Sequence, residues 1–155
     1  MLDKITNDAE YKYPSETDLE EEVIKQLTAL KEQRAVDGLR RIIRFDVEAY
    51  RDLTNFLVRN KAIVVGQAIE ALLEITNGAY LEEVQGFINY GIEEGATMDY
   101  DPEKDKFAAI RYHLVRGLRY AESEQAKALL VRALQDPHHE VKVFAHEVLQ
   151  RKLGR

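Results

Sequence analysis

Apolar residues recur along this chain of 155 residues with a period of 31, and this repeat constrains the fold more than any other feature. Within each unit the apolar positions follow the three- and four-residue spacing of a helix, once in each half. Some steps measure 46 residues instead, and all of them cross residues 91–105, so one insertion accounts for them. In the first helix of each unit, the set Leu53, Phe56 and Leu57 recurs as Val84, Phe87 and Ile88 and then as Leu130, Ala133 and Leu134. In the second helix, the set Val64, Ala68 and Leu72 recurs as Ile110, Leu114 and Leu118 and then as Val141, Ala145 and Leu149.

Self-similarity of this kind is typical of stacked helical hairpins, in which each pair buries its apolar face against its neighbours. We therefore predict an all-α fold, an α-α superhelix (solenoid) of about four helical hairpins in one right-handed stack. The second-helix residues from Val64 to Leu149 named above are all expected to be buried. The expected helices span residues 18–34, 36–45, 48–59, 61–76, 79–94, 104–121, 123–135 and 138–153.

Charge is distributed unevenly along the chain. Residues 1–22 hold eight acids and two bases, which already equals the net charge of −6. We expect residues 1–16 to be an acidic flexible tail ahead of a repeat domain at 17–155, because such a segment buries too little apolar surface to offset the entropy of ordering. Residues 62–105 sum to −9 and residues 106–155 to +5. Oppositely charged ends of this kind leave open a homo-oligomer that forms through them.

Residue content also narrows the cellular context. The chain has no cysteine, which excludes disulfides and thiolate zinc sites and favours a reducing compartment. No apolar run approaches the length of a membrane-spanning helix. Asp3, Lys4 and Asp8 stand where a signal peptide would need an apolar core. We expect a soluble cytoplasmic protein.

Motifs for catalysis or metal binding are incomplete. No phosphate loop, Gly-x-Ser-x-Gly elbow or His-Glu-x-x-His motif occurs. His139 and His146 share a helix face but lack further ligands of matching spacing. The acidic run at residues 99–105 imitates a calcium loop, yet Lys104 and Ile110 replace its glycine and its glutamate. We predict a non-enzyme that has neither a cofactor nor a metal.

The last unit carries a family resemblance. Residues 136–149, Asp-Pro-His-His-Glu-Val-Lys-Val-Phe-Ala-His-Glu-Val-Leu, resemble the second half of a short HEAT-like repeat of the type seen in phycobilin-lyase-related proteins. Lys142 replaces the usual arginine, whereas the third unit restores it as Arg111, with Asp105 at the aspartate position. The second unit has Arg59 where the aspartate belongs. The resemblance covers residues 19–154, and its motif has the aspartate capping the second helix while the basic residue anchors the stacking.

The resemblance and the repeat together favour a non-catalytic scaffold. We expect it to bind a protein partner through the concave face that the second helices form, through the acidic insertion at residues 91–105, or through both. Arginine and tyrosine are favoured at interface hot spots. We expect Tyr112, Arg116 and Arg119 to be exposed, adjacent and free of intramolecular ion pairs. The candidate partner-binding residues are Tyr112, Arg116, Arg119, Glu147, Glu70, Asp99 and Asp101.

Two other functions stay open. One is nucleic-acid binding, since the fold distantly resembles the HEAT-like DNA-alkylation glycosylases and the C-terminal block is basic. The acidic tail and insertion oppose this function because they would repel phosphates. The other is an accessory subunit or chaperone of an enzyme such as a bilin lyase, which the resemblance alone implies.

Overall fold

The computed structural model describes residues 16–30, 33–44, 55–92 and 100–154, and these form seven α-helices and three short 3₁₀-helices with no strand. The all-α prediction is confirmed for this part of the chain. The predicted tail lies outside the described residues except for Glu16. The helices are α2 (Glu16–Leu30), α3 (Gln33–Ile43), α5 (Asn55–Thr76), α6 (Leu81–Val84), η1 (Gln85–Asn89), η2 (Pro102–Lys104), α8 (Ala108–Gly117), η3 (Leu118–Tyr120), α9 (Glu124–Ala133) and α10 (His139–Leu153).

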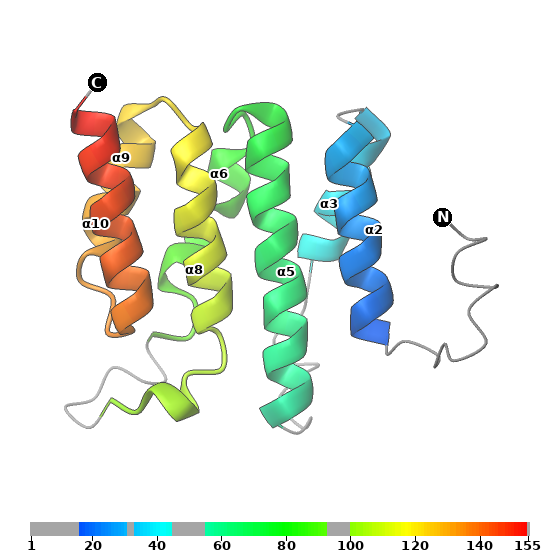
Figure 1. Cartoon of the computed structure of the whole chain (residues 1–155), viewed down its shortest axis with the longest axis horizontal. Coiled ribbons are helices and arrows are strands. Elements are labelled where there is room, and N and C mark those ends of the chain that lie inside the picture. Colours follow the sequence, from blue (N-terminus) through cyan, green and yellow to red (C-terminus); the bar gives the residue numbers. More distant parts are fainter. Residues whose placement is uncertain (1–15, 31–32, 45–54, 93–99, 155) are drawn as a thin grey trace.

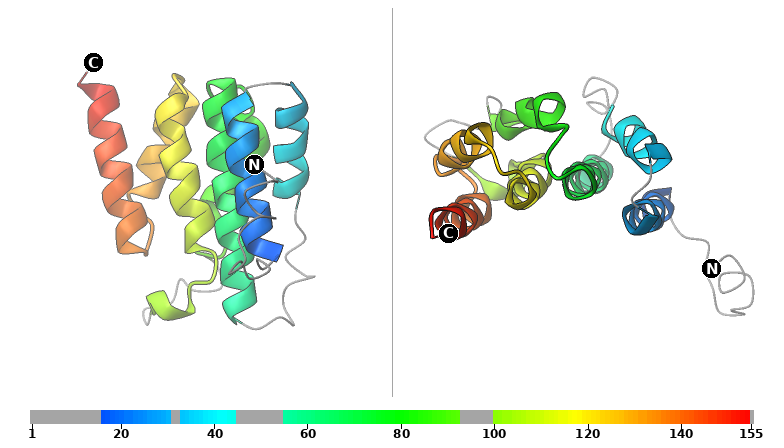
Figure 2. Two further views of the ribbon diagram at one scale, coloured as in Figure 1. Left: turned by 45° about the vertical axis from the view of Figure 1, so that its right-hand side comes forward. Right: turned by 90° about the horizontal axis from the view of Figure 1, so that it is seen from above.

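The helices form two layers. Helices α2, α5, α8 and α10 lie side by side as the first layer (Figure 1), and each packs against the next. Helices α3, α6 and α9 form the second layer behind it (Figure 2). Seen from above, α5 and α8 are set back from α2 and α10. The outer face of the first layer is therefore concave.

Helix α5 differs from the sequence prediction. It runs unbroken over 22 residues, whereas two helices were predicted at residues 48–59 and 61–76. The predicted break at residue 60 is wrong, because neither glycine nor proline occurs between Asn55 and Val65 to end the helix. Residues 45–54 lie outside the described part of the chain.

The first hairpin is out of phase with the predicted repeat. The predicted order of hairpins makes residues 18–34 the first helix of a pair, but α2 lies in the layer of the later second helices. Helix α3 instead lies beside α6, and Arg40 on α3 pairs with Glu83 on α6 at 2.9 Å. The same layer is joined further along, where Arg132 of α9 donates to Asn89 of η1 at 2.9 Å.

The core follows the repeat. Of the second-helix residues predicted to be buried, every one from Val64 to Ala145 has a relative exposure of 0%. Leu149 is the exception, because it is only partly buried against the core. Among the described residues, no helix lies on the outer side of α10 (Figure 1).

The hairpin between the two layers turns at Asn77 and Gly78, as the sequence predicts. Both residues have positive φ, 52° and 82°, and the Gly78 N–H donates to the Leu73 carbonyl at 2.9 Å, which ends α5. The helices on either side of the insertion are shorter than predicted. Helix α6 with η1 ends at Asn89, and α8 begins at Ala108, where residues 104–121 were expected to be one helix.

Candidate protein-binding surface

Two glycines bring α5 and α8 into close contact. A Cβ atom on Gly66 would lie 2.8 Å from the Ala109 carbonyl oxygen, and one on Gly117 would lie 2.7 Å from Leu73 Cδ1. At Gly66 the obstacle is a backbone atom, so a larger side chain would force the helices apart, whereas at Gly117 it is the end of the Leu73 side chain. The close packing puts the concave-face side chains of the two helices within reach of one another.

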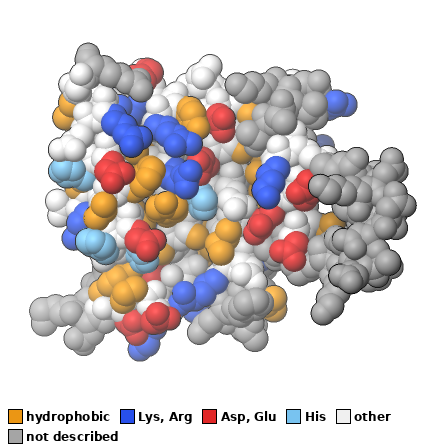
Figure 3. All heavy atoms as spheres, in the orientation of Figure 1, with side chains coloured by type: hydrophobic (Ala, Val, Ile, Leu, Met, Phe, Trp, Pro, Cys, Tyr) orange, Lys and Arg blue, Asp and Glu red, His pale blue; other side chains and the backbone are white. Residues whose placement is uncertain are grey.

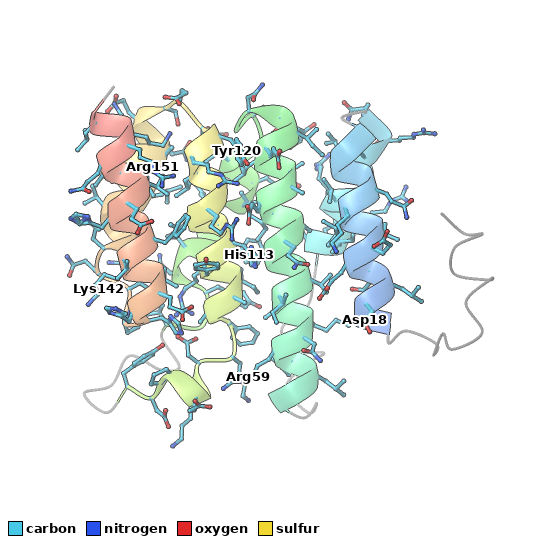
Figure 4. The ribbon with its side chains drawn as sticks, viewed as in Figure 1. Asp18, Arg59, His113, Tyr120, Lys142 and Arg151 are labelled. Atoms are coloured by element: carbon cyan, nitrogen blue, oxygen red, sulfur yellow. The ribbon has the colours of Figure 1, made fainter. Side chains whose placement is uncertain are left out.

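Glu70 on α5 is the centre of a charged cluster that includes three cationic or ionisable side chains. Its Oε1 lies 2.8 Å from His113 Nδ1, and its Oε2 lies 3.3 Å from Arg116 Nε. Arg119 Nη2 approaches the same Oε2 at 3.5 Å. Figure 4 shows His113 between α8 and α5. We call Glu70, His113, Arg116 and Arg119 the Glu70 cluster.

Aromatic rings support the two arginines from the other side. The Arg116 guanidinium carbon lies 5.8 Å from the Tyr112 ring centroid and 5.7 Å from that of Phe144 on α10. Arg119 lies 4.7 Å from the Tyr120 ring centroid and donates to the Tyr120 hydroxyl at 2.6 Å. Tyr112 and Phe144 meet edge to face at 5.6 Å. The Glu70 cluster therefore lies on α5, α8 and η3, and the rings that contact it come from α8, η3 and α10.

Electrostatics favour the charged form of Arg116. Partial burial would lower its pKa, but the Glu70 carboxylate and the neighbouring Tyr112 and Tyr120 together outweigh burial, and the pKa lies above its ordinary value. The Arg116 and Arg119 side chains keep 34% and 36% of their surface exposed, while Glu70 keeps 15%. The arginines are thus more accessible to an incoming molecule than the carboxylate between them.

A groove of about 520 Å³ adjoins the cluster. Residues of α2, α5 and α8 line it, and both charge signs are present, since its lining includes Glu21, Glu70 and Glu74 as well as Lys25 and Arg116. Charged, histidine and apolar side chains alternate over this face (Figure 3). The face is mixed in charge and continuous with the aromatic-supported arginines.

The structure brings together only part of the predicted site. Tyr112, Arg116, Arg119 and Glu70 are adjacent, but the expectation that the arginines lack intramolecular ion pairs is wrong, because both contact Glu70. Glu147 is exposed on α10. Asp101 accepts the Glu103 N–H at 3.0 Å and caps η2 in the insertion. Asp99 lies outside the described residues.

Sequence reasoning missed His113, which is not among the candidate partner-binding residues. Its side chain is only 15% exposed. The sequence did hold a signal for it. Glu70 and Arg116 occupy equivalent repeat positions 46 residues apart, and His113 and Arg119 lie three residues to either side of Arg116. Residues three apart share a helix face, so His113 and Arg119 are each expected beside Arg116.

A second polar network lies beneath this surface and is buried. Arg111 has a relative exposure of 0% and donates to Asp105 Oδ1 at 3.0 Å, to Asp136 Oδ2 at 2.8 Å and to the Tyr90 carbonyl at 2.9 Å. Asp136 also accepts the His138 N–H at 2.8 Å just before α10. The predicted stacking role of the basic residue agrees with this pairing, since Arg111 bridges two hairpins. The predicted capping role is wrong, because α8 and α10 begin after Phe107 and His138 without a side-chain capping hydrogen bond. Asp105 pairs with Arg111, so this carboxylate of the acidic run at residues 99–105 is already occupied by a cationic side chain.

Within the described ranges, no group of three or more His, Cys, Asp or Glu side chains could hold a metal ion. No helix in the same ranges is long and apolar enough to cross a membrane. Comparisons of the chain with protein-family models, with curated proteins and with solved structures find no match.

Proposed function

We propose that this chain is a non-catalytic HEAT-like scaffold that binds a protein partner on the outer face of its first layer. The observation that carries the proposal is the continuity of two features on one concave face. The groove between α2, α5 and α8 leads directly into the Glu70 cluster, since Glu70, His113 and Arg116 belong to both.

Three features support the solenoid part of this proposal. Helices alternate between two layers along the chain (Figure 2). Equivalent second-helix positions 31 and 46 residues apart are buried alike. Arg111 of one hairpin binds Asp136 of the next, so neighbouring units share a buried ion pair. Stacked repeats expose extended concave surfaces, which such proteins use for binding.

The chemistry of the face supports a protein as partner. Arginine and aromatic side chains dominate interface hot spots, and here they are already held in place by ring contacts and by Glu70. Holding side chains in place lowers the entropic cost of binding. Carboxylates interrupt the positive charge, and such mixed charge suits a protein surface better than a run of phosphates.

The groove can be tested by filling it. Peptides selected from a random display library against the wild-type chain would be titrated against Gln67→Trp, which places a ring in the groove. Ala128→Trp, on the exposed side of α9 in the second layer, is the matched control. We expect Gln67→Trp to weaken binding about tenfold or more, the cost of losing a hot spot, and Ala128→Trp to leave it unchanged. Equal binding to all three chains would refute the proposed surface.

A further inference from the structure

We infer that Arg116 and Arg119 form a receptor for carboxylate side chains, so that the partner offers an acidic segment to this face. The inference rests on the proposed function and specifies its chemistry. Its starting point is an imbalance of charge at one place: two guanidinium groups share the single carboxylate of Glu70.

The geometry of this sharing leaves binding capacity. Charge-assisted hydrogen bonds between arginine and carboxylate are typically about 2.7–2.9 Å long. The two contacts to Glu70 Oε2 measure 3.3 and 3.5 Å, and the shorter contact of that carboxylate, 2.8 Å, goes to His113. One carboxylate cannot satisfy the many N–H donors of two guanidinium groups. A second carboxylate from outside would complete their coordination.

The ring contacts prepare the arginines for such a ligand. Stacking on Tyr112, Phe144 and Tyr120 restricts the guanidinium groups without consuming most of their donors. A fixed guanidinium fork matches the two oxygens of a carboxylate, and little entropy remains to be lost when they bind.

More positive charge lies at the same end of the first layer. Figure 3 shows Lys and Arg side chains gathered over the upper part of α8 and α10. Arg151 on α10 lies near this end together with Tyr120 (Figure 4). It is exposed, and it forms no ion pair with any residue in the described ranges. A ligand with several carboxylates could therefore contact more than the two central arginines.

The acidic residues near Arg116 and Arg119 favour a polypeptide ligand over a nucleic acid. Glu74 lies in the adjoining groove, and Glu147 is exposed on α10. A nucleic-acid strand places a phosphate at every nucleotide and would bring some of them against these carboxylates. A polypeptide can place acidic side chains opposite the arginines and other residues opposite the acids.

Glu70 acquires a definite role in this arrangement, because it competes with the ligand for the same two guanidinium groups. Glu70→Gln removes the internal carboxylate while keeping the size of the side chain. We therefore expect this variant to bind an acidic peptide more tightly than the wild type does. A variant that merely misfolds cannot produce a gain in affinity.

The experiment uses a fluorescein-labelled peptide of alternating glutamate and glycine, with a matched glutamine peptide, and measures anisotropy on the full chain. Arg116→Gln with Arg119→Gln is compared with Arg41→Gln plus Arg132→Gln, which makes the same charge change on α3 and α9 of the second layer. We expect the first pair to weaken glutamate-peptide binding about tenfold or more and the second to change it by less than about twofold. Glu70→Gln should strengthen it by about threefold or more, and the glutamine peptide should not bind.

Equal weakening by both double variants would mean that net charge alone drives binding, and would overturn the inference. So would a single-stranded oligonucleotide that binds more tightly through the same two arginines, since it would identify a nucleic acid as the ligand. A glutamate peptide that fails to bind the wild type would also overturn it. The proposed function would survive that failure if display-selected peptides still lost affinity for Gln67→Trp.

Discussion

Arg111 and Asp136 form a fully buried ion pair that joins two consecutive hairpins. The Arg111 Nε donates to Asp136 Oδ2 at 2.8 Å, and its Nη2 donates to Asp136 Oδ1 at 3.2 Å. The side chains are 0% and 1% exposed. Because Asp136 also accepts the His138 N–H, the pair fixes the start of α10 relative to α8. This buried ion pair therefore holds α8 and α10, the last two helices of the concave face, in position relative to each other.

Asp136→Asn should destabilise the protein severely. The substituted amide would turn an N–H₂ group toward the Arg111 donors and leave a buried guanidinium short of one negative partner. Breaking a buried ion pair typically costs about 3–5 kcal/mol. We expect the free energy of unfolding, measured by urea titration, to fall by about 3 kcal/mol. Asp37→Asn, at an exposed position on α3, should change it by less than about 0.5 kcal/mol.

Asp105 should make stability depend on acid pH. Burial alone would raise its pKa, but hydrogen bonds from Arg111 and Tyr100 outweigh burial and lower it below the ordinary value. The depressed pKa contributes stability that is fully present above the unfolded pKa of about 3.9 and lost as pH falls through the folded value. Urea midpoints of the wild type should therefore fall steeply below about pH 4. Asp105→Asn should show a shallower decline, and parallel profiles would contradict this assignment.

Tyr100 should resist ionisation. Burial and the hydrogen bond that its hydroxyl donates to Asp105 raise the pKa of this phenol far above its usual value. Wild type and Tyr100→Phe should therefore show the same tyrosinate absorbance increase between neutral pH and about pH 11. In guanidinium chloride the wild type should exceed the variant by one tyrosine. An excess already present in the folded protein would show that the phenol ionises normally.

Arg116 and Arg119 should contribute to stability as well as to binding. Each combines a partly exposed contact to Glu70 with a ring contact, and such interactions contribute up to about 1 kcal/mol each before solvent screening. We expect the double alanine variant to lose about 1 kcal/mol of unfolding free energy in total. Arg41→Ala with Lys142→Ala, two exposed positions on α3 and α10, should lose less than about half of that.

Sequence periodicity predicted the buried faces well and the helix phase poorly. Burial imposes the same three- and four-residue spacing on both helices of a hairpin, so apolar positions alone do not tell one helix from the other. The last unit has an Asp-Pro turn that marks its second helix. The first unit has no such marker, and α2 was assigned one helix out of phase. Two adjacent apolar residues of α2 also differ in burial: Ile24 is 5% exposed and belongs to the core, whereas Val23 is 46% exposed.

The sequence predicted the candidate surface only in part, as it did the fold. Repeat equivalence placed Glu70, Arg116 and Glu147 on one face of neighbouring helices, and the structure keeps this arrangement for Glu70 and Arg116. Equivalence does not give the distance between helices, so the ion pairs within the Glu70 cluster did not follow from it. That distance depends on which small residues lie between the helices, and here they are Gly66 and Gly117.

Gly66→Ala should therefore separate α5 from α8. Alanine is favoured over glycine inside a helix by about 1 kcal/mol, which by itself would stabilise α5. Its methyl group, however, would lie 2.8 Å from the Ala109 carbonyl oxygen and 2.9 Å from His113 Cδ2, and forced overpacking costs about 1–3 kcal/mol. Because backbone cannot yield as a side-chain tip can, we expect the steric cost to win and the unfolding free energy to fall. The Glu70 cluster should loosen as well, with weaker binding of the glutamate peptide.

Gly86→Ala is the matched control, since nothing lies within 4 Å of the added carbon, and its stability should be unchanged or slightly higher. A Gly66→Ala chain as stable as the Gly86→Ala chain would mean that α5 and α8 do not depend on this close contact.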